Sequence, residues 1–151
     1  MSSLSIRNAF KQFLADNSDE SVVDITGHFE DLRTMLADEG IQPDAPFLAI
    51  EFIGGVEEPV SLAADNTQGL YREYGSLQLH VCAAERIGVG ASLASRGQAL
   101  HNLFRGRRIG NIIVEGVYPL NTGPGATLEA EAGLVSGTVS IDFHADTTPG
   151  T

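Results

Sequence analysis

The stretch Tyr71–Ala83, YREYGSLQLHVCA, decides the fold class because two kinds of side chain alternate along it. The residues of one face are apolar or aromatic: Tyr71, Leu77, Leu79 and Val81. Those of the other face are mostly polar: Ser76, Gln78, His80 and Cys82. A period of two is the spacing of a β-strand, so the stretch predicts a strand with one buried face.

Three other stretches predict strands. They are Phe47–Ile53 (FLAIEFI), Ile109–Tyr118 (IGNIIVEGVY) and Leu134–His144 (LVSGTVSIDFH). The first is nearly all apolar, which is typical of a strand buried on both faces.

Apolar residues at helical spacing predict three helices. The first covers Ser5 to about Ala15. The second starts near Thr26 as N-cap and stops at Gly40, and the third has Ser92 as its cap and closes at Gly106. The resulting order, α-α-β-β-α-β-β, predicts an α+β fold.

We expect one domain over residues 1–151, a common size for a single domain. Residues 1–45 form its helical N-terminal part, and residues 46–146 carry the sheet and the main helix. The expected sheet has four strands, is mixed or mostly antiparallel, and is covered by helices on one side.

Two long connectors, Gly54–Gly69 and Leu120–Gly133, are expected to project from the sheet. Connectors of this length serve a function, are ordered by a partner, or extend a strand pair into a projecting hairpin. Simple surface disorder is the alternative.

The charge is unevenly distributed along the chain. The net charge is −11, and residues 1–65 hold thirteen acids against three bases. This balance excludes a protein that binds nucleic acid through a basic surface, although it suits a protein that faces DNA without binding it. An acidic surface that only maintains solubility explains the same balance.

Membrane insertion and a disulfide framework are not expected either. No apolar run approaches the ~20 residues of a membrane span, and the N-terminus lacks a secretory segment. The single cysteine, Cys82, leaves no intramolecular disulfide, so the cytoplasm is the expected place of synthesis.

Arginine outnumbers lysine by eight to one. Arginine forms bidentate pairs with carboxylates, so arginine-rich and acidic faces that meet head to tail predict self-assembly into a ring or a filament. The candidates for a subunit interface are Arg72, Arg96, Arg105, Arg107 and Arg108. The alternative is that they are unrelated surface charges near a helix C-terminus.

Two motifs near Gly88 resemble parts of enzyme sites. Gly88 and Gly90 match two glycines of a dinucleotide fingerprint, with Glu115 at the distance of a ribose ligand. Ser92 lies in an incomplete nucleophile elbow and precedes Asp142 and His144 in hydrolase order. A capping turn explains the same residues, so we predict no catalytic or cofactor-binding residue.

A metal site is imaginable only if two strands are neighbours. Asp142, His144 and Asp146 share a face of the last strand, and His80 and Cys82 share a face of another. Polar surface residues explain this pattern equally well, so no metal is predicted.

From Pro46 onward the chain resembles the tail terminators of long-tailed bacteriophages. The resemblance rests on the ordered set PFLAIEFI, GLYREYGSLQLHVCA, ASRGQALHNLFRG and GTVSIDFHAD, with the Arg72–Gly75 turn and the helix end Leu103–Gly106. It covers about two thirds of the chain, and the long acidic second helix departs from the family's pattern.

The resemblance implies a structural virion protein rather than an enzyme. Such a subunit forms a hexameric ring on the last turn of the tail tube, stops its growth and offers a surface to the head-side neck, while DNA crosses the lumen without specific binding. It would be assembled in the host cytoplasm and reside in the virion at the head–tail junction. A neck or head-completion adaptor and a small serine hydrolase using Ser92 are the alternatives.

Three acids of the first connector, Glu57, Glu58 and Asp65, are the candidates for the lumen or tube-facing side of that ring. A loop with carboxylates and no base suits a channel that DNA crosses better than the core of an apolar interface. Two alternatives are that these acids pair with the arginines of a neighbouring subunit, or that they serve solubility alone.

Overall fold

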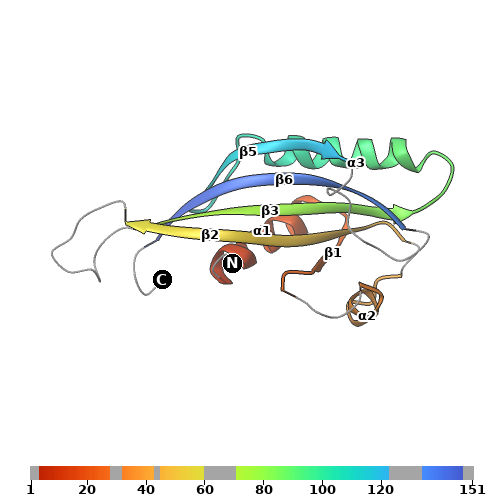
Figure 1. Ribbon diagram of the computed structural model, residues 1–151, viewed down its shortest axis with the longest axis horizontal. Helices are drawn as coiled ribbons and strands as arrows, with labels where there is room; N and C mark the ends of the chain where they lie inside the picture. The colour runs from red at the N-terminus through yellow and green to blue at the C-terminus, as the bar shows by residue number, and fades with distance from the viewer. Residues whose placement is uncertain (1–3, 28–31, 43–44, 60–70, 123–133, 148–151) are drawn as a thin grey trace.

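The computed structural model describes residues 4–27, 32–42, 45–59, 71–122 and 134–147. Its helices are α1 (Leu4–Asn17), α2 (Leu32–Asp38) and α3 (Val89–Phe104). Its strands are β1 (Ser21–Asp24), β2 (Phe47–Pro59), β3 (Tyr71–Ala84), β4 (Arg108–Ile109), β5 (Ile112–Asn121) and β6 (Leu134–Thr147). The long strands curve together into one sheet (Figure 1).

The prediction of an α+β fold holds, but the prediction of a four-stranded sheet is wrong. Within the described residues the sheet has six strands in the order β1-β2-β3-β6-β5-β4. β1 runs parallel to β2, and all other neighbours are antiparallel, so the sheet is mixed. The two additional strands, β1 and β4, are the shortest and lie at its two edges.

β1 occupies a stretch that follows the acidic segment after α1. Its four residues pair with the start of β2, from Ser21 opposite Phe47 to Asp24 opposite Ile50. Thr26, which we predicted to cap the second helix, lies in the turn after β1. Its hydroxyl accepts a hydrogen bond of 2.9 Å from the Phe52 backbone N–H, so it fixes this edge of the sheet instead.

β4 and β5 form a hairpin where the sequence predicted one strand from Ile109 to Tyr118. Gly110 has a φ of +60° and is followed by Asn111, and these two residues turn the chain between Ile109 and Ile112. A glycine with positive φ at the first position is what a type II′ hairpin turn requires. The apolar run therefore supplies two strands.

β2 continues six residues beyond its predicted end at Ile53. Gly54 and Gly55 lie opposite the single residue Gly75 of β3, and Gly54 has a φ of +59°. This two-against-one arrangement is a β-bulge, which lets pairing resume at Val56 and run to Pro59. The first part of the expected connector is thus a strand, consistent with the projecting-hairpin alternative.

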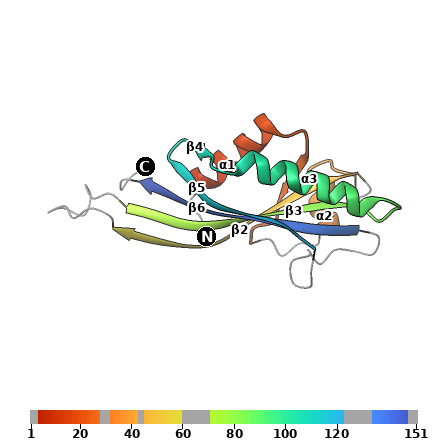
Figure 2. The same ribbon diagram turned by 90° about the horizontal axis from the view of Figure 1, so that it is seen from above.

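One face of the sheet carries the main core beneath α1 and α3 (Figure 2). Alternate strand residues point into it, as the sequence predicted for Leu77, Leu79 and Val81. Phe10 of α1 lies at its centre, with its ring centroid 4.9 Å from that of Phe143 and 5.9 Å from that of Phe52. Apolar contact with this core holds both helices against the sheet.

α2 packs against the opposite face, so the expectation that helices cover only one side is wrong. Phe47, Ala49 and Cys82 point away from the main core and contact Met35 and Leu36. The alternation of β2 requires this arrangement, because all of Phe47–Ile50 are fully buried and therefore need cover on both faces. Gly40, with a φ of +70°, ends the turn after α2 as predicted.

Asp24 connects β1 to α1. Its carboxylate Oδ2 lies 2.9 Å from Arg7 Nη2 and 2.8 Å from Lys11 Nζ. Burial opposes its ionisation, but hydrogen bonds from Lys11, Thr26 and Arg7 outweigh burial and hold the pKa of Asp24 well below its ordinary value. The ionised carboxylate therefore stabilises the junction between the helix and the sheet edge.

Candidate assembly surfaces

The sheet face opposite to α1 and α3 is mostly polar beyond the part that α2 covers, although Ile53, Val56 and Ile113 are exposed on it. We call this surface the open face. Its β2 and β3 residues are Glu51, Ile53, Val56, Glu58, Arg72, Tyr74, Ser76 and Gln78. Its β5 and β6 residues are Ile113, Glu115, Tyr118, Ser140, Asp142, His144 and Asp146. They share a face because directly paired residues of neighbouring strands point the same way.

Cross-strand pairs connect the polar residues of the open face. Arg72 donates two hydrogen bonds to Asp146, of 2.7 and 3.0 Å. These hydrogen bonds lower the pKa of the Asp146 carboxyl. The Tyr118 hydroxyl lies 3.1 Å from Asp142 Oδ2, a hydrogen bond that raises the pKa of Tyr118. The open face is therefore an organised polar surface.

The open face is also acidic. Its described residues include five carboxylates: Glu51, Glu58, Glu115, Asp142 and Asp146. Among the same residues Arg72 is the one arginine. His144 Nδ1 lies 2.5 Å from Glu115 Oε1. Such a surface repels a polyanion at short range and remains hydrated.

The three predicted lumen residues do not form one group. Glu57 and Glu58 belong to β2, opposite Glu73 and Arg72 of β3, and both are exposed. Because strand residues alternate, Glu58 lies on the open face and Glu57 on the other. Asp65 lies outside the described residues.

The five candidate interface arginines divide into two groups. Arg72 is paired with Asp146, and Arg96 Nε donates a hydrogen bond of 2.6 Å to Glu20 Oε1. Arg96 also donates to the carbonyl oxygens of Cys82 and Phe47, at 2.9 and 3.0 Å. Both therefore connect elements of their own subunit.

The other three arginines are exposed where α3 ends and β4 begins. Arg105 donates to Asn102 Oδ1 at 3.1 Å, and Arg108 donates to the Gly110 carbonyl at 3.1 Å. The Arg107 guanidinium lies 5.5 Å from the centroid of the Phe13 ring of α1. These short-range bonds leave much of each guanidinium accessible, so this group remains a candidate for contact with another molecule.

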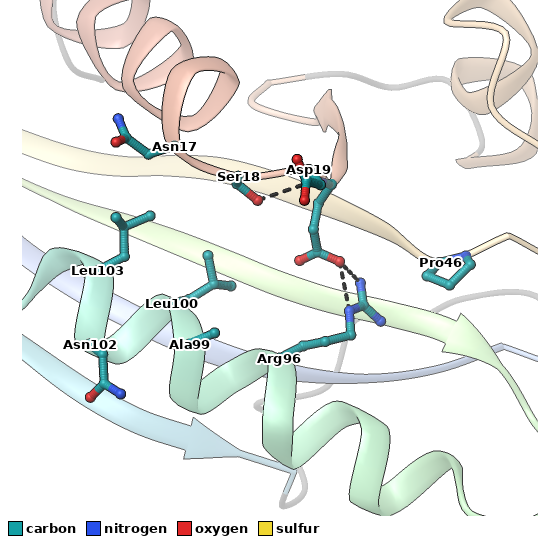
Figure 3. A pocket seen from close by; sticks show the side chains of 10 residues that line it. Asn17, Ser18, Asp19, Pro46, Arg96, Ala99, Leu100, Asn102 and Leu103 are labelled. Carbon is teal, nitrogen blue, oxygen red and sulfur yellow. Dashed lines mark hydrogen bonds and ion pairs between the residues drawn. The ribbon is translucent and has the colours of Figure 1, made fainter.

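Beside this group is a pocket of about 680 Å³, which Figure 3 shows in close-up. It lies between the end of α1, the segment before β1 and the second half of α3. Its apolar lining consists of Pro46, Ala99, Leu100 and Leu103, and its polar lining of Asn17, Ser18, Asp19, Glu20, Arg96 and Asn102. We did not predict it from the sequence, because its lining comes from three segments far apart in the chain.

Ser92 does not cap α3, so that prediction is wrong. The helix begins at Val89, and its N-cap is Gly88 with a φ of 84°, without a side-chain capping bond. Ser92 lies inside the first turns of a helix that packs on the main core. Asp142 and His144 point to the open face, so the sheet separates them from Ser92 and the structure does not assemble this triad.

The other sequence motifs are separated in the same way. Gly88 and Gly90 belong to the start of α3, whereas Glu115 contacts His144 on the open face. β3 and β6 are neighbours, yet among the described residues no group of three or more His, Cys, Asp or Glu side chains could hold a metal ion. His80 Nδ1 lies 2.8 Å from the Thr138 hydroxyl instead.

None of the described helices combines the length and the apolar character needed to cross a membrane. No protein-family model matches the chain. A search of curated proteins found no match either.

Proposed function

We propose that the protein is a structural virion subunit, a tail terminator that forms a ring of six copies at the head-side end of a tail tube. The observation that supports this most is the acidic open face, which extends over four strands of the sheet. Although Ile53, Val56 and Ile113 are exposed on it, its five carboxylates and their hydrogen bonds make it unsuited to the core of an apolar interface. It suits the wall of a channel through which DNA moves without sticking.

In this proposal the open face, including Glu58, turns toward the lumen. Repulsion between its carboxylates and DNA is screened over about 8 Å at physiological salt, so only residues at the channel wall act on the DNA. The exposed arginines Arg105, Arg107 and Arg108 contact a neighbouring subunit, while Arg72 and Arg96 maintain the fold of their own subunit. The tube protein and a neck protein bind the two ends of the ring.

The test is the fate of virus particles assembled without this protein. Overlong tails are expected, because nothing stops the growth of the tube. Normal tails beside unjoined heads would instead identify a neck or head-completion adaptor. A protein that stays monomeric at high concentration, and is also monomeric within the virion, would rule out both roles.

A further inference from the structure

The turn before α3 exposes an apolar side chain completely. Ile87 has a relative accessibility of 104%, the highest of the exposed large hydrophobic residues in the described part of the chain. The Val89 N–H donates to the Arg86 carbonyl at 3.1 Å, and Gly88 adopts a φ of 84°. This hydrogen bond closes a turn of the backbone around Ile87, whose side chain extends into solvent.

The pocket beside the second half of α3 offers a complementary surface. Ala99, Leu100 and Leu103 provide an apolar wall, and Figure 3 shows them on the same side of the helix as Arg96. Arg96 and Glu20 neutralise each other in an ion pair. Asp19, an exposed carboxylate at the rim, is therefore the main uncompensated charge of the lining.

The charges beside Ile87 match those beside the pocket. Arg86 precedes Ile87 and is exposed, and within the described ranges no ion pair joins Arg86 or Asp19 to another residue. Glu85 lies on the other side of Arg86, and Arg105 is bonded to Asn102 of the pocket lining. Each apolar surface is thus flanked by one basic and one acidic side chain: Arg86 and Glu85 precede Ile87, and Arg105 and Asp19 lie beside the pocket.

One molecule cannot make this contact with itself. Ile87 lies beyond the N-terminal end of α3, whereas the pocket lies along the second half of the same 16-residue helix. A rigid helix keeps the two apart, since each residue advances the axis by about 1.5 Å. A knob and a pocket at different places on one surface form a heterologous contact, which closes into a ring when its rotation permits.

We propose that Ile87 of one copy inserts into the pocket formed by Ala99, Leu100 and Leu103 of the next, with Arg86 paired to Asp19. This contact rests on the proposed ring and names the residues through which its subunits meet.

The test compares assembly of four variants with that of the wild type, by light scattering in solution and by microscopy of particles. Ile87→Ser should weaken ring formation by about tenfold or more, because it removes a buried aliphatic side chain from each contact. Leu4→Ser, a matched change at another exposed apolar residue, should leave assembly unchanged. Thermal melting of both should match the wild type, since neither side chain supports the fold.

A charge exchange makes the test specific. Arg86→Glu should weaken assembly, and the double variant that combines it with Asp19→Arg should recover much of the lost assembly. If Ile87→Ser forms rings as readily as the wild type, or if Ile87→Ser and Leu4→Ser lose ring formation equally, this contact is overturned and the proposed ring is left intact. A wild type with no ring in solution or in particles would overturn the proposed function as well.

Discussion

Gly97 of α3 faces Leu120 of β5 so closely that a Cβ atom on Gly97 would lie 2.8 Å from Leu120 Cβ. The missing side chain lets the helix rest directly on the sheet. Gly97→Ala should therefore destabilise the fold by about 1–3 kcal/mol through overpacking, although alanine favours helices. Chemical denaturation measures the change. Gly90→Ala in the same helix is the control: nothing lies within 4 Å of its added Cβ, so no loss is expected there.

The Asp24 cluster predicts a particular acid sensitivity. Because the folded pKa of Asp24 lies below its ordinary value of 3.8, the ionised carboxylate stabilises the native state at neutral pH. Asp24→Asn should lower the free energy of unfolding at neutral pH by about 1–2 kcal/mol, a modest value because solvent partly screens the cluster. The difference between wild type and variant should shrink as the pH falls below 3.8. A difference that stays constant down to lower pH would contradict this role of Asp24.

Cys82 should be an unreactive thiol in the folded protein. Burial raises the pKa of Cys82 to about 12, and its side chain is enclosed beneath α2. At about pH 8 a thiol-specific reagent should label the native protein only as fast as it unfolds, whereas the denatured chain should react at once. Rapid labelling without unfolding would mean that α2 does not cover this thiol.

The exposed arginines at the end of α3 should affect assembly rather than stability. Arg105→Glu combined with Arg108→Glu should weaken ring formation. Added salt should reduce the difference in assembly between this double variant and the wild type, because salt screens exposed charges. Each substitution should alter unfolding stability by no more than about 0.5 kcal/mol. Arg96→Glu is the contrasting variant, since it removes bonds to Glu20, Cys82 and Phe47 and should destabilise the subunit itself. If the double variant assembles as well as the wild type, these arginines do not contribute to the subunit interface.

The long periodic elements were predictable from the sequence because each carries its own signal. The alternation of Tyr71–Ala83 placed Leu77 and Cys82 on the correct faces. The apolar run Phe47–Ile53 indicated cover on both faces, which α2 and the α1–α3 layer provide. The expectation of helices on one side ignored that signal.

The short elements were not predictable, since tertiary contacts rather than local patterns determine them. β1 has only four residues and exists by pairing with β2. Thr26 and Ser92 both have side chains that can cap a helix. The Thr26 hydroxyl instead accepts a hydrogen bond from the Phe52 N–H, and Gly88 rather than Ser92 is the N-cap of α3. The pocket beside α3 could not be predicted because Asp19, Pro46 and Leu103 meet only after folding.

The position of β6 has a consequence for how the sheet is completed. β6 is the last of the described strands, yet it lies in the interior of the sheet, between β3 and β5. Tyr71 pairs with Thr147 across a wide separation in sequence, and a ladder of such long-range contacts is typical of slowly folding proteins. Until β6 is synthesised, β4 and β5 have no strand that joins them to the rest of the sheet. A nascent chain that stops before Leu134 would therefore lack the strand that joins β3 to β5 and leave apolar residues exposed at the gap, although α3 contacts both strands.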